Sequence, residues 1–203
     1  GLGDVYKRQG VAAFTTSTGY GIAKYDNPEE LSVSDRNNIG YQYTDCPLYW
    51  ISVIYLNFAE AKAEMGSLTQ DDLNNSINKL QARAGLPAMT TTPDADPANN
   101  MGVSNLIWEI RRCRRCELIM DNWYRYWDLI RWHQLDKLDS TKYPNTMLGA
   151  NVSNVPDCEE ATKNGYIDAS DAQIRTYEAK HYFYPIPTTQ LTLNKNMKQN
   201  PGW

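Results

Sequence analysis

The 203-residue sequence has no long hydrophobic run and no excess of positive charge. No stretch approaches the roughly 20 apolar residues that a membrane-spanning helix needs, and the first residues lack the basic and then apolar order of a secretory signal. Lysine and arginine together number 20 against 24 aspartate and glutamate residues, which gives a formal net charge of -4. Because binding to a phosphate backbone requires a basic excess, this balance argues against a nucleic-acid partner.

Cysteine is also scarce. The four cysteines, Cys46, Cys113, Cys116 and Cys158, are too few and too scattered to form a disulfide scaffold. Cys113 and Cys116 have the CxxC spacing of redox and metal sites, and the two arginines between them favour a thiolate. However, this pair lies inside a predicted helix with no parallel-sheet pattern around it, and zinc would need two more ligands. We therefore expect packing roles, with no metal and no cofactor.

The sequence contains only two histidines, His133 and His181, and none of the common catalytic or nucleotide-binding motifs. His133 lies in an aromatic helix, where a packed or half-exposed role is commoner than catalysis, and His181 precedes a strand-like run. No pair of carboxylates and no nucleophile with a nearby base stands out for hydrolysis. We predict no catalytic residue, and therefore a protein that is not an enzyme.

Aromatic residues are present but unevenly distributed, with 14 tyrosines and 6 tryptophans against 3 phenylalanines. Tyrosine and tryptophan rings carry a polar group, so they suit partly solvent-exposed surfaces, and the apolar faces of sugars stack on such rings. Early in the chain Tyr20, Tyr25, Tyr41 and Tyr43 lie in a segment rich in glycine, threonine, serine and asparagine. These four are the candidate ligand-binding residues, and the alternative is that each ring packs over its own loop.

The first nine residues differ from the sequence that follows. They show neither periodicity nor turn chemistry, and one codon choice for 4–9 reproduces a transposon end used in sequencing libraries. We therefore predict that 1–9 is a non-native start, that the native region is 10–203, and that the gene continues upstream. The missing upstream part would carry the export signal, which makes the chain truncated at the N-terminus.

Helical periodicity begins at Tyr49. A first helix is predicted over 49–66 and a second over 69–85, where Thr69 is the expected N-cap, and together they form an αα-hairpin over 49–87. This hairpin has the size of one tetratricopeptide unit. In the first helix one apolar stripe recurs at three- and four-residue steps: Ile51, Ile54, Tyr55, Phe58 and Ala61.

A second helix pair is predicted over 104–138, with one helix near 104–120 and an aromatic one near 122–137. Charged residues are unusually dense on these mostly apolar helices, so they must be paired. We predict that the following residues form a structural network that holds the pair together, the alternative being an anion-binding site: Arg111, Arg114, Arg115, Glu117, Arg125, Asp128 and Arg131. Residues 139–180 are polar and turn-rich, which indicates irregular loops.

Three blocks of the sequence resemble the C-terminal half of the SusD/RagB family of outer-membrane nutrient-binding lipoproteins. The first is the hairpin, 49–87, which begins YWISVIYLNFAEA and ends QARAGLP. The second, 110–132, is similar to the family pattern IRxERRxEL…EGxRxxDLxRW, with Asp121-Asn122 in place of Glu-Gly. The third, 181–203, contains YPIP and ends in QNPGW.

The resemblance implies a mainly α, tetratricopeptide-like (SusD-like) fold with long irregular loops. It also implies a cell-surface protein of the outer membrane, lipid-anchored through its N-terminal part, that binds oligosaccharides or polysaccharides without cleaving them. Its implied partner is a TonB-dependent, SusC-like transporter. A helical-repeat scaffold for protein–protein interaction is the alternative, and a glycan-degrading enzyme lacks the acid and base pair.

Overall fold

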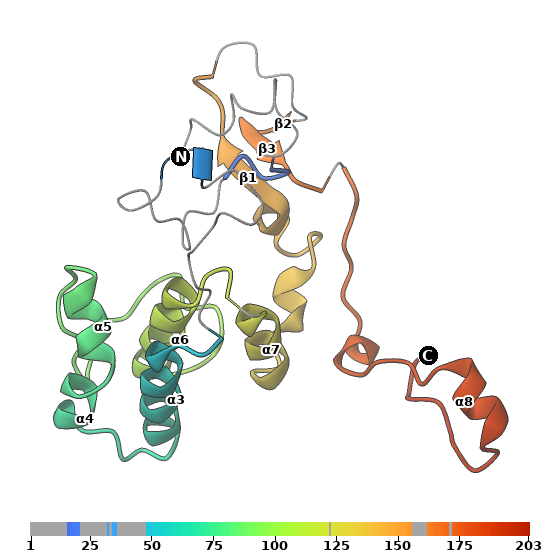
Figure 1. Ribbon diagram of the computed structural model, residues 1–203, viewed down its shortest axis with the longest axis horizontal. Coiled ribbons are helices and arrows are strands. Elements are labelled where there is room, and N and C mark those ends of the chain that lie inside the picture. The colour runs from blue at the N-terminus through green and yellow to red at the C-terminus, as the bar shows by residue number, and fades with distance from the viewer. Residues whose placement is uncertain are drawn as a thin grey trace. The chain divides into compact units, whose positions relative to one another are not determined.

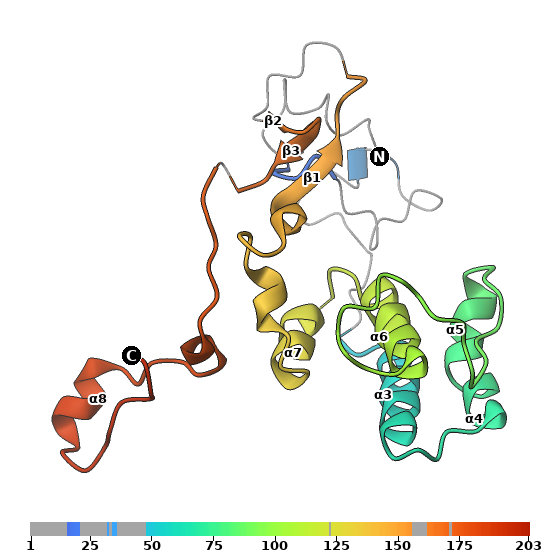
Figure 2. The ribbon, with the colours of Figure 1, turned by 180° about the vertical axis from the view of Figure 1, so that it is seen from behind.

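The computed structural model describes residues 16–20, 32, 34–35, 48–121, 123–155, 162–170 and 172–203. The expected non-native start, 1–9, lies outside these ranges. The chain divides into two compact units, whose helices and strands are labelled in Figures 1 and 2. One is the helical unit, Pro47–Gln134, and the other combines Gly1–Cys46 with Leu135–Trp203. The described part is mainly helical, as predicted from the sequence, and it also contains one small sheet.

The predicted αα-hairpin forms, but its second helix is broken. Helix α3 covers Ile51–Glu64, and the segment predicted as one helix is divided into α4, Gln70–Asn74, and α5, Ile77–Arg83. At the break, the Ser76 hydroxyl donates to the Asp72 carbonyl at 2.5 Å, and the backbone of Ser76 leaves the helical region. Serine side chains compete in this way with the helical hydrogen bonds, which explains the interruption.

Local motifs explain why α3 ends and α4 begins where they do. Gly66 adopts a positive φ of 66°, and the amides of Gly66 and Ser67 bond back to the carbonyls of Ala63 and Lys62. This pattern is the Schellman motif, which ends a helix at a left-handed glycine. Helix α4 then begins at a capping box, in which the Thr69 side chain accepts from the Asp72 amide and the Asp72 carboxylate accepts from the Thr69 amide.

The capping carboxylate makes a pH prediction possible. A hydrogen bond from Lys62, followed by those from Thr69, lowers the pKa of Asp72 from 3.8 to about 2. Since the folded-state pKa is depressed, the stabilisation is complete above 3.8 and disappears as the pH falls toward about 2. We expect Asp72→Asn to lower the urea midpoint at neutral pH and to flatten its decline through this acid range. The neighbouring variant Asp71→Asn is the control, and an unchanged acid slope in Asp72→Asn would contradict the assignment.

The hydrophobic core of the helical unit uses the opposite face of α3 from the predicted stripe. Ile51, Ile54 and Phe58 are 63%, 59% and 43% exposed, whereas Leu56 and Ala59 are fully buried. Leu56 belongs to a cluster with these residues: Val53, Ala59, Leu73, Ile77, Leu80, Met89, Ile110 and Leu118. Helix α3 carries apolar residues nearly all round, so periodicity alone did not identify its inner face, and the prediction of a single apolar stripe was wrong.

The second predicted helix pair is also present. Helix α6 covers Asn105–Glu117 and is capped by Ser104, whose hydroxyl accepts from the Ile107 amide at 3.3 Å. It packs against α3 and α5. Helix α7 is shorter than predicted, Tyr124–Arg131, because His133 adopts a positive φ of 53° and a 3-10 turn, η2 (Leu135–Leu138), follows. No helix among the described residues is both long and apolar enough to cross a membrane.

The second unit contains a sheet that the sequence reading missed. Strands β1 (Leu148–Asn151), β2 (Thr162–Lys163) and β3 (Tyr166–Asp168) are antiparallel in the order β1-β3-β2, after the 3-10 turn η3, Pro144–Met147. Asn164 and Gly165, both with positive φ, join β2 to β3. Asn-Gly at a two-residue connection is a strong hairpin signal, and it was overlooked in a segment read as loops.

The C-terminal motif of this unit folds back on the chain before it. The 3-10 turn η4 covers Ala179–Tyr182 and helix α8 covers Thr188–Leu193. The Gln199 side chain bonds both the amide and the carbonyl of Ile186, at 2.7 and 2.9 Å, and Asn200 donates to the Tyr184 carbonyl. The predicted strand-like run after His181 is therefore an extended segment held by side chains, with no strand among its described residues.

Candidate functional site

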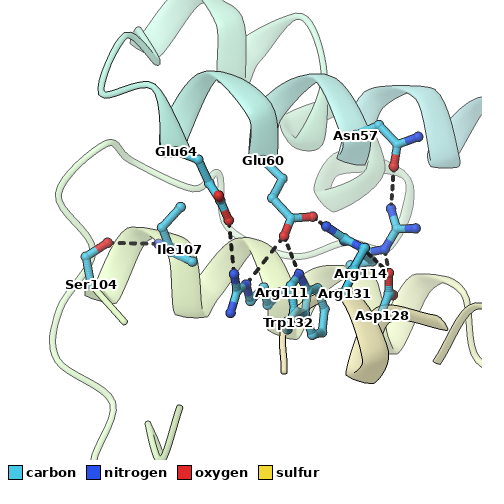
Figure 3. A network of polar contacts seen from close by, with 10 residues as sticks. All are labelled: Asn57, Glu60, Glu64, Ser104, Ile107, Arg111, Arg114, Asp128, Arg131 and Trp132. Carbon is cyan, nitrogen blue, oxygen red and sulfur yellow. Dashed lines mark hydrogen bonds and ion pairs between the residues drawn. The ribbon is translucent and has the colours of Figure 1, made fainter. Parts of the chain in front are cut away.

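A cluster of paired polar residues surrounds Glu60 of α3, within the helical unit (Figure 3). Glu60 is only 3% exposed although its carboxylate is charged. One oxygen accepts from the indole Nε1 of Trp132 at 2.6 Å, and the other accepts from Arg131 at 2.5 Å. The Nε of Arg111 lies 3.4 Å from Oε1, near enough for charge attraction but not as a hydrogen bond. One carboxylate on α3 thus holds groups from α6 and from the end of α7.

Asp128 of α7 is the second centre of this network. Its carboxylate accepts from Arg114 of α6 at 2.7 Å and from Arg131 at 2.8 Å. The side chains of Arg114 and Asp128 are each 5% exposed. A second nitrogen of Arg114 donates to the Asn57 side chain on α3 at 2.8 Å. Arg114 therefore joins all three helices.

Arg111 completes the network. Its terminal nitrogen donates to Glu64 at 3.0 Å, and its guanidinium lies 4.6 Å from the ring centroid of Trp132. The Arg131 guanidinium lies 4.7 Å from the same ring. Cations over an indole face are attracted by the ring quadrupole, most strongly where water is excluded. Trp132 is itself buried, so it acts as both a hydrogen-bond donor and a surface for two cations.

The charges of this network balance. The arginines Arg111, Arg114 and Arg131 face the carboxylates Glu60, Glu64 and Asp128. Buried charges are tolerated when they are paired and hydrogen-bonded, and here no member has lost its counter-charge. We infer that the network orders three helices and does not capture an anion. The same pairing makes Glu60 and Asp128 unsuited to general acid or base work, which needs a proton-accepting group free to reach a substrate.

Three of the predicted network residues lie elsewhere. Arg115 is exposed, and Glu117 pairs with Arg83 of α5 at 2.6 Å. Arg125 is half-buried, and burial, followed by the positive charge of Arg115, lowers its pKa to about 10. Among the described residues Arg125 makes no hydrogen bond or ion pair.

The sequence reading missed the partners that α3 supplies, Asn57, Glu60 and Glu64. The predicted ion pairs all lay within α6 and α7, between residues three positions apart in the sequence. One signal was available, because a glutamate at 60 interrupts an otherwise apolar run, and a buried carboxylate requires a partner. The partner lies about fifty to seventy residues further along the chain, at a sequence separation that periodicity does not reach.

The cysteines and histidines that the structure describes do not form a reactive site. Burial, and after it the charge of Glu117, raises the pKa of the half-buried Cys113 thiol to about 12, so it stays protonated at neutral pH. Cys116 is exposed, and the other two cysteines lie outside the described residues. His181 accepts from the Glu178 amide and lies against Trp203. Among the described residues no group of three metal-ligating side chains occurs.

Of the four candidate ligand tyrosines, the structure describes only Tyr20. Its side chain is 55% exposed, and its amide donates to the Thr18 hydroxyl at 3.3 Å. Tyr25, Tyr41 and Tyr43 lie outside the described residues, so the structure does not show whether the four rings form one surface. Their role in ligand binding stays a prediction.

A different pair of aromatic rings is exposed at the start of α7. Trp123 is 80% exposed and Trp127 is 53% exposed. Trp123 also adopts a left-handed backbone with φ 59° and ψ 17°. A residue other than glycine in this region costs about 1–2 kcal/mol. Aligning Arg125 and Asp128 with the pattern EGxRxxDLxRW places its glutamate at 122 and its glycine at 123. Asn122-Trp123 therefore stands in place of Glu-Gly, and the pairing with Asp121-Asn122 was one residue out of register.

Comparisons with known proteins agree with this architecture. The model of the SusD family matches residues 4–203. A crystal structure of a SusD-like protein from Bacteroides fragilis is 24% identical, has a TM-score of 0.53, and is matched over 77% of this chain and 25% of that chain. The protein BT4246 is 28% identical with a TM-score of 0.55, over 77% of this chain and 23% of that chain.

The selenomethionine form of BT4246 is 30% identical to this chain and has a TM-score of 0.56, and the match covers 79% of this chain and 25% of that chain. The chain thus spans about a quarter of the length of these solved structures. No curated protein matches it.

Proposed function

This chain belongs to the SusD family, and from that membership we propose that it is part of a surface protein that binds glycans and delivers oligosaccharides to a SusC-like, TonB-dependent transporter. The observation that carries the proposal is the match of the family model over residues 4–203. The mainly helical fold supports it. Capture without cleavage is part of this proposal.

The binding step is tested with the full-length product of the gene. Neutral sugars offer no charge to screen, so we expect measurable affinity for at least one glycan that changes little between low and high salt. Isothermal calorimetry with a panel of neutral and acidic glycans measures this, and chromatography of the products shows whether new reducing ends form. Tight binding only to a peptide or to a strongly salt-dependent ligand would contradict the proposal.

The proposed partner and location need a separate experiment. If the protein is lipid-anchored at the cell surface beside a transporter, it should fractionate with the outer membrane and co-purify with a large TonB-dependent channel. Detergent extraction followed by affinity purification and mass spectrometry tests both points. Recovery in the soluble fraction without the channel would contradict this part and leave the glycan-binding test unaffected.

One observation favours a second candidate, a helical scaffold for protein–protein interaction. The exposed apolar residues of α3 and its C-cap recur at steps of three and four: Ile51, Ile54, Phe58, Ala61 and Met65. This spacing matches the seam along which two helices pack nearly parallel to each other. A stable complex with another protein, formed through this face in the absence of any glycan affinity, would favour the scaffold.

A further inference from the structure

Two arginines lie close to each other where the end of α6 meets the start of α7. Arg114 of α6 donates to Asp128 of α7, and its guanidinium lies 5.8 Å from the centroid of the Tyr124 ring, so the two helices are held together at this point. Arg115 follows Arg114 in α6, and Arg125 follows Tyr124 in α7. Burial, and after it the positive charge of Arg115, lowers the pKa of Arg125, which agrees with two cations near enough to repel each other.

Arg125 lies on the inner side of α7. Asp128 and Trp132 are buried on that side, and Arg125 precedes them by three and seven residues, which is the spacing of one helical face. Arg125 is itself half-buried, and an arginine in such a position is normally paired. Asp128 attracts it, but the Asp128 carboxylate already accepts hydrogen bonds from Arg114 and Arg131.

Arg115 also makes no hydrogen bond or ion pair with a described residue. It lies four residues after Arg111 and three before Leu118, which are both buried, so its side chain starts on the same side of α6 as theirs and extends into solvent. The sequence also lacks a carboxylate at 122, three residues before Arg125, where the family pattern has its glutamate. Neither arginine is therefore paired with an acid that the structure describes.

One half-buried and one exposed guanidinium group make a site that an anion can enter from solvent. A carboxylate accepts two parallel N–H···O bonds from a guanidinium, and such charge-assisted bonds are stronger than neutral ones. We propose that Arg115 and Arg125 bind the carboxylate of a uronate residue in an acidic glycan. The assignment rests on the proposed glycan-binding function, to which it adds a preference for an acidic chain over its neutral counterpart.

The test titrates the full-length product by calorimetry with oligosaccharides of galacturonan, alginate and hyaluronan, each beside its neutral, carboxyl-reduced form. For at least one pair we expect the acidic chain to bind about tenfold more tightly at low salt, because charge-assisted hydrogen bonds are gained. Arg125→Gln and Arg115→Gln should each bring this ratio toward one. Arg125→Lys should keep only part of it, because lysine has the charge without the planar fork of donors.

Arg112→Gln is the matched control. It removes one positive charge from the same helix, but Arg112 is paired with Glu109, so the preference for the acidic chain should stay about tenfold. High salt should reduce the preference and leave the affinity for the neutral chain unchanged. A sulfated oligosaccharide provides the same oxyanion chemistry. If it gains affinity through Arg115 and Arg125 while no uronate chain does, the site takes sulfate and the uronate assignment is wrong.

The melting temperature separates a ligand from an acid elsewhere in the protein. Arg125→Gln should not lower it, whereas a fall of several degrees would show that the protein itself neutralises Arg125, and the anion site would be wrong. If neutral glycans bind and no acidic chain binds more tightly than its reduced form, the anion site fails while the proposed function stands. If no glycan of either kind binds, both fail.

Discussion

Replacement of Asp128 by alanine should cost about 3–5 kcal/mol of unfolding free energy, the largest effect we expect from any single substitution in the helical unit. Asp128 accepts from Arg114, and both side chains are 5% exposed. Removing the carboxylate leaves the Arg114 guanidinium buried, with Asn57 as its only side-chain hydrogen-bond partner among the described residues and the Tyr124 ring 5.8 Å away. It also removes one of the two carboxylates that hold Arg131. Urea denaturation followed by circular dichroism measures the loss.

A surface ion pair of the same chemistry is the control. Arg112 of α6 donates to Glu109 three residues earlier, at 2.6 Å, with side chains 53% and 14% exposed, so the pair is less buried than Arg114 and Asp128. Exposed pairs contribute little, so Arg112→Ala should change the unfolding free energy by less than about 1 kcal/mol. If Asp128→Ala left the melting temperature unchanged and abolished ligand binding, the network would be a binding site and its structural assignment would be wrong.

The second large effect is expected at the centre of the hydrophobic core. Leu56 is completely buried on the inner face of α3, in the cluster that also contains Ile77 and Ile110. Leu56→Ala removes three heavy atoms from a packed interior and leaves a cavity, at a cost of about 2–5 kcal/mol. The urea midpoint should fall accordingly.

Ile54 provides a matched comparison two residues away on the same helix. Its side chain is 59% exposed, so Ile54→Ala should change the stability of the 203-residue chain by about 0.5 kcal/mol or less. An equal loss in both variants would contradict the assignment of the inner face. Measuring Leu56→Ala and Ile54→Ala in the full-length product also shows whether another helix covers the exposed face of α3. If one does, Ile54→Ala will lower the unfolding free energy of the full-length product but not that of the 203-residue chain.

Local signals predicted the helices well where one short stretch of sequence contains the whole cause. The Thr69 capping box, the Ser104 cap and the glycine at 66 each act within a few residues, and the structure contains all three. The break in the second helix was missed although its cause is also local. There the Ser76 hydroxyl donates to the Asp72 carbonyl and competes with the helical hydrogen bonds. The apolar residues continue at helical spacing across the break, so periodicity did not reveal it.

The family was predicted on the same basis, because its motifs are short and keep their spacing in the sequence. The structure explains one of them. In QNPGW the Gln199 and Asn200 side chains bond the backbone of the YPIP segment, and Gly202 adopts a φ of 87°. A Cβ at Gly202 would lie 2.9 Å from the Lys180 side chain, so the close return of the chain limits what this position accepts.

Sequence alone determined where the helices of the helical unit lie along the chain, that charges on α6 and α7 must be paired, and which family the chain resembles. These follow from local backbone chemistry and from the cost of burying an uncompensated charge. Tertiary structure decided which face of α3 is buried and that Glu60 accepts from Arg131 and Trp132. A helix that is apolar nearly all round has no preferred inner face until other helices pack on it, and partners seventy residues apart meet only in the folded chain.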